Sequence, residues 1–179
     1  IKSLNKYVKM VQNGDKSLGY KLQGFKGEQD IDKFGKIGGV LSRSQNILVQ
    51  VVKEPISTKG PRLSCEVSIA GRYLVLVPFS TSVNVSKKIA DKDERQRLSR
   101  LIQSIKPENF GVIIRTVAQG KEVAELDKDL KSLLKKWEDG FNTLRTARPK
   151  DKIIGEMNRA SSILRDLLNE GFDAIVVDN

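Results

Sequence analysis

The segment Gln50–Pro78, which joins a basic loop to β-forming runs, constrains the fold of this chain more than any other part of its sequence. The runs Ile47–Val52 and Tyr73–Val77 are rich in β-branched and aliphatic residues, which fit a pleated and mostly buried surface. The loop carries cations, hydroxyls and a glycine, groups that hydrogen-bond phosphate oxygens: Lys53, Ser57, Thr58, Lys59, Gly60 and Arg62. A cationic loop held between strands indicates a nucleic-acid contact site, and an ordinary β-turn is the alternative.

The charge balance favours a polyanionic partner. The chain has 32 Lys and Arg residues against 22 Asp and Glu residues, a formal net charge of +10. RNA explains this excess readily, and a soluble basic domain without such a partner is the alternative. Aromatic residues make up only 6% of the chain, which argues against an extended platform for stacking bases. Contact with backbone phosphates is therefore the expected mode of binding.

Missing residue types exclude several chemistries. The chain has no histidine, so histidine acid–base catalysis and histidine metal ligation are excluded. The single cysteine, Cys65, cannot form an internal disulfide or a multi-cysteine zinc site, and we expect a buried, inert thiol in a reducing cytoplasm. The sequence has no signal peptide and no apolar run long enough to span a bilayer. Because it starts at Ile1 and stops at Asn179, we expect a piece of a longer protein.

The N-terminal half is expected to hold mainly strands and loops. SLNKYVKMVQ predicts a short amphipathic helix, and NGDKSLGYKLQGFKGEQD after it is typical of a loop, either a solvated insertion or an RNA-contacting one. Strand segments broken at GKIGG are expected within Asp30–Val52. Further strands are expected at Glu66–Ile69, Arg72–Val77 and Val83–Val85, with Pro78 ending the second of these because proline has no amide for the ladder.

The C-terminal half alternates helices and strands. Helical spacing of apolar residues predicts a helix over Asp91–Ser104 and a long amphipathic helix over Val123–Leu144, whose apolar stripe should pack in the core. A last helix is expected at about Asn158–Asn169. Strands are expected over Gly111–Val117 and, as a buried element, over Ala174–Val177. Together these patterns predict an α+β fold.

Several motifs in this order and spacing resemble the ribonuclease E/G family. They are VQVVKEPISTKGPRLS, AGRYLVLVP, SKKI, DERQRL, FGVIIRTVAQGK, LKKWED and the terminal LRDLL and IVVDN. The likeness runs from about Asp30 to Asn179, and the KEPISTKGPR form is most similar to the ribonuclease G type of Bacteroidetes-like bacteria. Residues 1–29 match none of the family's motifs and are interpreted as a lineage-specific insertion.

The resemblance implies three parts. Residues 1–65 would be the C-terminal part of an OB-fold RNA-binding barrel with the insertion, 66–148 an α/β five-prime sensor subdomain, and 149–179 the edge of a structural RNase H-like subdomain. The family consists of single-strand-specific endoribonucleases that process ribosomal RNA and start messenger RNA decay. They favour RNA with a 5′-monophosphate, cut with magnesium held by aspartates in a separate domain, and assemble into homo-oligomers assisted by a zinc link. This chain would hold no catalytic residue, no metal and no cofactor of its own.

The resemblance also implies a phosphate pocket. Arg115 and Thr116 match the family's Arg-Thr pair that grips the terminal phosphate, and a guanidinium with a hydroxyl suits a phosphate monoester. Without the resemblance, an ion pair or a strand-edge contact would be the default interpretation. Val75 matches a valine whose backbone lines the pocket. Lys87 stands where relatives often have arginine, which keeps the charge but loses the bidentate geometry.

Other residues receive weaker assignments. Lys53 and Lys59 match lysines on the RNA-contacting side of the barrel, with Arg62 beside them, and solvated surface charge is the alternative. Arg72 falls where some relatives have serine. Asp178 is interpreted as structural or capping, because the family's cutting aspartates lie beyond it. Gln119-Gly120-Lys121 is expected to be a turn before the long helix.

Two other functions compete with the sensor interpretation. A stand-alone RNA- or ribosome-binding protein without hydrolase activity would share the basic charge. A self-contained enzyme would need a carboxylate-bound metal, and the sequence shows no convincing acidic cluster.

Overall fold

The computed structural model describes residues 2–14, 19–29, 31–32, 34–169 and 171–176. The elements follow one another as α1 (Lys2–Gln12), the 3₁₀ turn η1 (Ile37–Gly39), β1 (Gln50–Lys53), β2 (Arg62–Ser64), β3 (Ile69–Ala70), β4 (Leu74–Pro78), β5 (Val83–Val85), α2 (Lys92–Ile105), β6 (Phe110–Ile114), η2 (Thr116–Ala118), α3 (Val123–Leu144) and α4 (Arg159–Leu167). This mixture confirms the predicted α+β class. Among the described residues, no helix is both long enough and apolar enough to cross a membrane.

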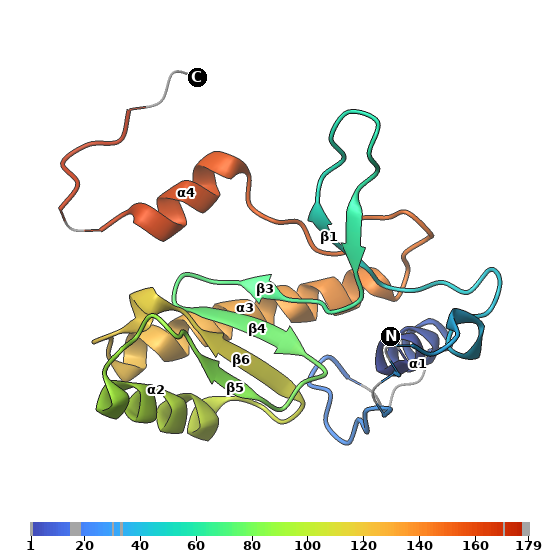
Figure 1. Cartoon of the computed structure of the whole chain (residues 1–179), viewed down its shortest axis with the longest axis horizontal. Coiled ribbons are helices and arrows are strands. Elements are labelled where there is room, and N and C mark those ends of the chain that lie inside the picture. Colours follow the sequence, from blue (N-terminus) through green and yellow to red (C-terminus); the bar gives the residue numbers. More distant parts are fainter. Residues whose placement is uncertain (1, 15–18, 30, 33, 170, 177–179) are drawn as a thin grey trace.

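A four-stranded sheet in the order β3-β4-β6-β5 forms the centre of the molecule (Figure 1). The neighbours β3, β4 and β6 are antiparallel, with Val75 opposite Ile113. Strand β5 runs parallel to β6, and α2 makes the crossover that a parallel pair requires. The carboxyl ends of β5 and β6 therefore lie side by side, which matters for the candidate site.

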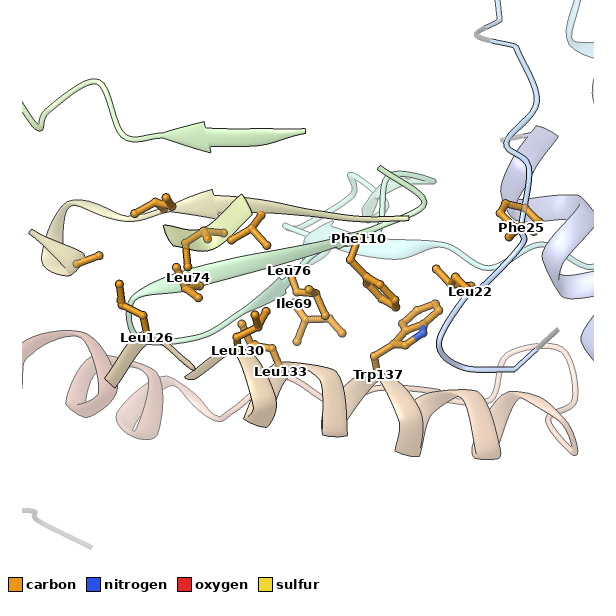
Figure 2. Packing of buried hydrophobic residues seen from close by; sticks show 14 of the residues in the cluster. Leu22, Phe25, Ile69, Leu74, Leu76, Phe110, Leu126, Leu130, Leu133 and Trp137 are labelled. Atoms are coloured by element: carbon orange, nitrogen blue, oxygen red, sulfur yellow. The ribbon is translucent and has the colours of Figure 1, made fainter. Parts of the chain in front are cut away.

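Helix α3 covers one face of this sheet and closes the core. Its buried residues Leu126, Leu130, Leu133 and Trp137 recur on one side of the helix, as expected for an amphipathic helix. Figure 2 shows them directed at Leu74, Leu76 and Phe110 of the sheet. Burial alternates along β4 because successive side chains of a strand point to opposite faces. The predicted core role of the α3 stripe is confirmed.

Local signals explain the limits of the two central helices. Asp91 caps α2 by accepting from the amides of Asp93 and Glu94. Glu122 and Glu125 form a capping box at the start of α3. The observed bounds of α3 match the prediction, and Gln119–Lys121 forms the expected turn, with Gly120 at φ +71°.

The N-terminal segment is part of the same core, which the sequence did not indicate. The amphipathic helix is confirmed, but its apolar side is buried: Tyr7 is 0% exposed and its ring contacts Phe79 and Trp137 at centroid distances of 4.9 and 5.8 Å. The Trp137 indole N–H donates to the Tyr20 carbonyl at 2.8 Å, and the neighbouring Leu22 is fully buried. A wholly solvated insertion is therefore wrong. The apolar residues of α1 are buried by aromatic side chains that lie far away in the sequence, such as Phe79 and Trp137.

Strand content was over-predicted before Gln50. The described part of the region Asp30–Val52 holds the 3₁₀ turn η1 and, as its only strand, the residues of β1 up to Val52. The polar and glycine-rich sequence before Gln50 lacks the alternation that a half-buried strand needs. Strands β1 and β2 pair as an antiparallel hairpin that projects from the body (Figure 1), and the described residues close no barrel. Cys65 beside this hairpin is a free thiol and only half-buried, which corrects the expected burial.

The strand expected at Ala174–Val177 is also wrong as far as the structure describes it. Residues 174–176 form no strand and are exposed, Val176 by 92%. An apolar run becomes a strand only when another strand pairs with it, and the described chain offers this run none. Val177 and Asp178 lie outside the described residues.

Candidate functional site

The carboxyl ends of the parallel strands β5 and β6 bring two polar pairs together. Ser86 and Lys87 follow β5, and Arg115 and Thr116 follow β6. The Ser86 amide donates to the Ile114 carbonyl at 2.9 Å, and the hydroxyls of Ser86 and Thr116 lie 2.9 Å apart. The predicted strand Gly111–Val117 thus ends earlier than expected. Thr116 begins the 3₁₀ turn η2, so Arg115 lies just past the carboxyl end of β6, where its amide donates to the Tyr73 carbonyl at 2.9 Å.

The guanidinium of Arg115 is held by a carboxylate and by backbone oxygens. Its Nη1 and Nη2 donate to Oδ1 and Oδ2 of Asp166 at 2.8 and 2.9 Å. Nη1 also donates to the carbonyls of Gly71 and Arg72 at 2.7 and 3.2 Å. Hydrogen bonding to Arg115, and then to Arg165, holds the pKa of Asp166 well below its ordinary value, and the same ion pair raises the pKa of Arg115. Both groups are therefore charged at neutral pH.

The tight turn that supplies those carbonyls is held by Asp129 of α3. Its carboxylate accepts from the amides of Arg72 at 3.2 Å and of Tyr73 and Leu74 at 2.9 Å each. A Cβ at Gly71 would lie 2.7 Å from both carboxylate oxygens, so this position needs glycine for the close approach of the carboxylate. Asp129 thereby fixes the two carbonyls that Arg115 uses.

The other predicted pocket residues take different positions. Lys87 is exposed, on a turn that the Arg95 guanidinium ties to α2 by donating to the carbonyls of Ser86 at 2.6 Å and Ile89 at 3.2 Å. Val75 is half-buried inside β4, which has a partner strand on both edges. The roles of Val75 and Lys87 in phosphate binding stay predictions.

The predicted RNA-contacting cations lie together on the β1–β2 hairpin. Lys53 lies opposite Arg62 in the register of the hairpin. Lys59 lies in the loop between the two strands, where its backbone forms a β-bridge with Ile56. All three side chains belong to exposed residues. They lie on a different sheet from Arg115. The structure therefore separates the predicted residues into a cationic hairpin and a site at the β5–β6 ends.

Arg72, the weaker candidate, lies next to Arg115 rather than on the hairpin. Its guanidinium donates to the Leu168 carbonyl and lies 5.5 Å from the centroid of the Tyr73 ring. It thus links the turn, whose Arg72 carbonyl accepts from Arg115, to the end of α4.

Sequence reasoning missed the two carboxylates that organise this site. Asp129 falls on a predicted helix and Asp166 on another, 51 residues from Arg115 in the chain. Neither has a local signal for this site, because the fold alone brings Asp129 to the β3–β4 turn and Asp166 to Arg115. Across the described part of the chain, no three Asp, Glu, Cys or His side chains gather as a potential metal site.

Fold and site together define a basic α+β domain with a hydrogen-bonded arginine at the carboxyl end of β6. The chain belongs to the Ribonuclease E/G family, whose profile matches residues 68–179, more than half of the chain. The resemblance noted from the motifs is thereby confirmed.

Proteins named Ribonuclease E and proteins named Ribonuclease G are both similar to this chain. It is 38% identical over 140 residues to Ribonuclease E of Nostoc sp. (strain PCC 7120), covering 78% of this chain and 20% of that protein. It is 35% identical over 143 residues to Ribonuclease G of Escherichia coli K12, covering 80% and 29%, and 36% identical over 152 residues to Ribonuclease G of Haemophilus influenzae, covering 85% and 31%. The chain thus spans less than a third of the length of these relatives.

Proposed function

We propose that this chain is the RNA-binding and 5′-monophosphate-sensing part of a single-strand-specific endoribonuclease. The observation that carries the proposal is Arg115, an arginine fixed by four hydrogen bonds at the carboxyl end of β6; the hydroxyl of the next residue, Thr116, lies 2.9 Å from that of Ser86. A fixed guanidinium can bind a phosphate monoester by charge-assisted hydrogen bonds, and hydroxyls can donate further hydrogen bonds to phosphate oxygens. Membership of the Ribonuclease E/G family supports an RNA ligand.

The remaining parts of the proposal concern the whole protein. It would be a cytoplasmic, homo-oligomeric hydrolase that cuts RNA with magnesium held outside the described residues. The names of its relatives, Ribonuclease E and Ribonuclease G, favour this over a stand-alone RNA- or ribosome-binding protein. The division into barrel, sensor and RNase H-like parts remains a prediction.

Removing the guanidinium should abolish recognition of the RNA end. A 5′-monophosphate carries about 1.5–2 negative charges near neutral pH, whereas a 5′-hydroxyl carries none. Because charge-assisted bonds contribute roughly 1.5–3 kcal/mol each, Arg115→Ala should lower the preference for monophosphorylated over hydroxylated RNA by about tenfold or more. Fluorescence anisotropy with two short single-stranded RNAs that differ only at the 5′ end measures this ratio.

Two further variants make the measurement specific. Arg115→Lys keeps the charge but loses the fork, so it should restore only part of the preference. Lys131→Ala removes a cation from an α3 side chain that is 73% exposed and should leave the ratio unchanged. Wild-type discrimination retained by Arg115→Ala would return Arg115 to a purely structural role.

General RNA affinity should depend on salt through the cationic hairpin. If Lys53, Lys59 and Arg62 each neutralise one phosphate of a single strand, the log–log salt slope should contain about −0.7 from each. Replacing all three by alanine should therefore make the slope shallower by about 2. The double variant Lys131→Ala/Lys135→Ala is a control on α3 and should change the slope little. An unchanged slope in the triple variant would mean that the hairpin does not contact phosphate.

A further inference from the structure

The hydrogen bonds of Arg115 divide its guanidinium into an occupied edge and a free edge. A guanidinium has five N–H donors in a planar fork. Asp166 takes one hydrogen from each of Nη1 and Nη2, and the carbonyls of Gly71 and Arg72 share the other hydrogen of Nη1. Within the described part of the chain, Nε donates to no residue, and the second hydrogen of Nη2 is also left over.

The two N–H donors that remain, on Nε and Nη2, lie along one edge of the planar guanidinium group. Parallel N–H groups at such an edge match two oxygens of one phosphate. The side chain of Arg115 is 28% exposed, so part of it is in contact with solvent. We propose that Asp166 is a positioning residue for the phosphate site: it holds the Nη1–Nη2 edge so that the Nε–Nη2 edge faces the terminal phosphate.

Asp166 is itself fixed by its surroundings. Arg165 Nε donates to Asp166 Oδ1 at 2.9 Å, and Arg165 Nη1 donates to the Ala70 carbonyl of β3 at 3.2 Å. Arg72 reaches the carbonyl of Leu168 just after α4. Helix α4 is thereby attached to the β3–β4 turn on both sides of Asp166, and recognition of the RNA end is linked to the docking of α4.

The charges leave room for a phosphate despite the carboxylate. Two guanidinium groups, those of Arg115 and Arg165, meet at Asp166, while the nearby Asp129 is bonded to three backbone amides. A carboxylate that competed with the phosphate would take the edge that the phosphate needs. Asp166 takes the adjacent Nη1–Nη2 edge and leaves the Nε–Nη2 edge open, which favours positioning over competition.

This inference rests on the proposed function and has a test of its own. The ratio of the dissociation constants for 5′-hydroxyl and 5′-monophosphate RNA is measured for wild type, Asp166→Ala, Asp166→Asn and Asp166→Glu. We expect the ratio to fall about tenfold in Asp166→Ala and Asp166→Asn, within the range of coupling between contacting groups, and to be partly restored in Asp166→Glu. Asp139→Asn, which removes a carboxylate paired with Lys135, is the matched control and should keep the wild-type ratio.

A nuclear magnetic resonance titration separates positioning from general loss of structure. In wild type, the Arg115 Nε–H resonance should shift with monophosphorylated RNA and stay in place with hydroxylated RNA, and Asp166→Asn should lose this shift while its amide spectrum stays folded. A higher ratio in Asp166→Ala would show that the carboxylate competes. An unchanged ratio there, with Arg115→Ala still defective, would overturn positioning and leave the proposed function standing. Equal binding of both RNAs by wild type would overturn both.

Discussion

Truncating Tyr7 to alanine should destabilise the chain by about 3–5 kcal/mol, the range for removing a large aromatic side chain from a core. The ring is 0% exposed and contacts four other rings, those of Phe25, Phe79, Trp137 and Phe141. Its loss would leave a cavity where α1 meets the end of α3. Urea unfolding followed by circular dichroism measures the change in the free energy of unfolding.

The hydroxyl of Tyr7 provides an internal control. It is buried and has no hydrogen-bond partner among the described residues, and burial raises its pKa above the ordinary value. A buried polar group without a partner costs about 1–3 kcal/mol, so Tyr7→Phe should be at least as stable as wild type. Lys9→Ala, on the exposed side of α1, should change stability little. Wild-type stability in Tyr7→Ala would mean that α1 does not belong to the core in solution.

Local patterns predicted the helices and the strands β4 and β5 of this protein well, whereas the strand expected at Glu66–Ile69 shares only Ile69 with the observed β3. The stripe of α3 and the cap of α2 lie within one stretch of sequence, so periodicity and capping residues are enough to locate them. The apolar run of β4 is similarly self-contained. Long-range burial was not predictable: nothing near Tyr7 in the sequence indicates that its partner is Trp137, 130 positions along the chain.

The candidate site divides in the same way. The Arg115–Thr116 pair is a local motif, and its resemblance to the family made it a candidate. Asp166 and Asp129 became part of the site only through the fold, since Arg115 lies 51 residues from Asp166 and the amides that Asp129 binds lie 55 to 57 residues from it. The run Ile175–Val176 shows the converse error, because apolar sequence predicted burial where the described structure leaves these residues exposed.

Replacing Asp129 should have the second large effect, because one carboxylate satisfies three backbone donors. Charge-assisted hydrogen bonds contribute roughly 1.5–3 kcal/mol each, and water would replace part of this at a half-buried position. We therefore expect Asp129→Ala and Asp129→Asn to lower the free energy of unfolding by about 2–4 kcal/mol in total. Urea unfolding measures the loss, and Asp127→Asn, which removes the partner of Lys131 two positions earlier on α3, is the matched control.

A double-mutant cycle with Gly71 tests whether the contact itself is responsible. Gly71→Ala should destabilise wild type, since its Cβ would lie 2.7 Å from both Asp129 carboxylate oxygens, and should cost much less in the Asp129→Ala background. The same variants should weaken discrimination between RNA ends, because the turn that Asp129 holds supplies the Gly71 and Arg72 carbonyls to Arg115. Additive effects of Gly71→Ala and Asp129→Ala would show that the carboxylate and the turn are not coupled. Loss of stability with full end discrimination would show instead that Asp166 alone is enough to orient the arginine.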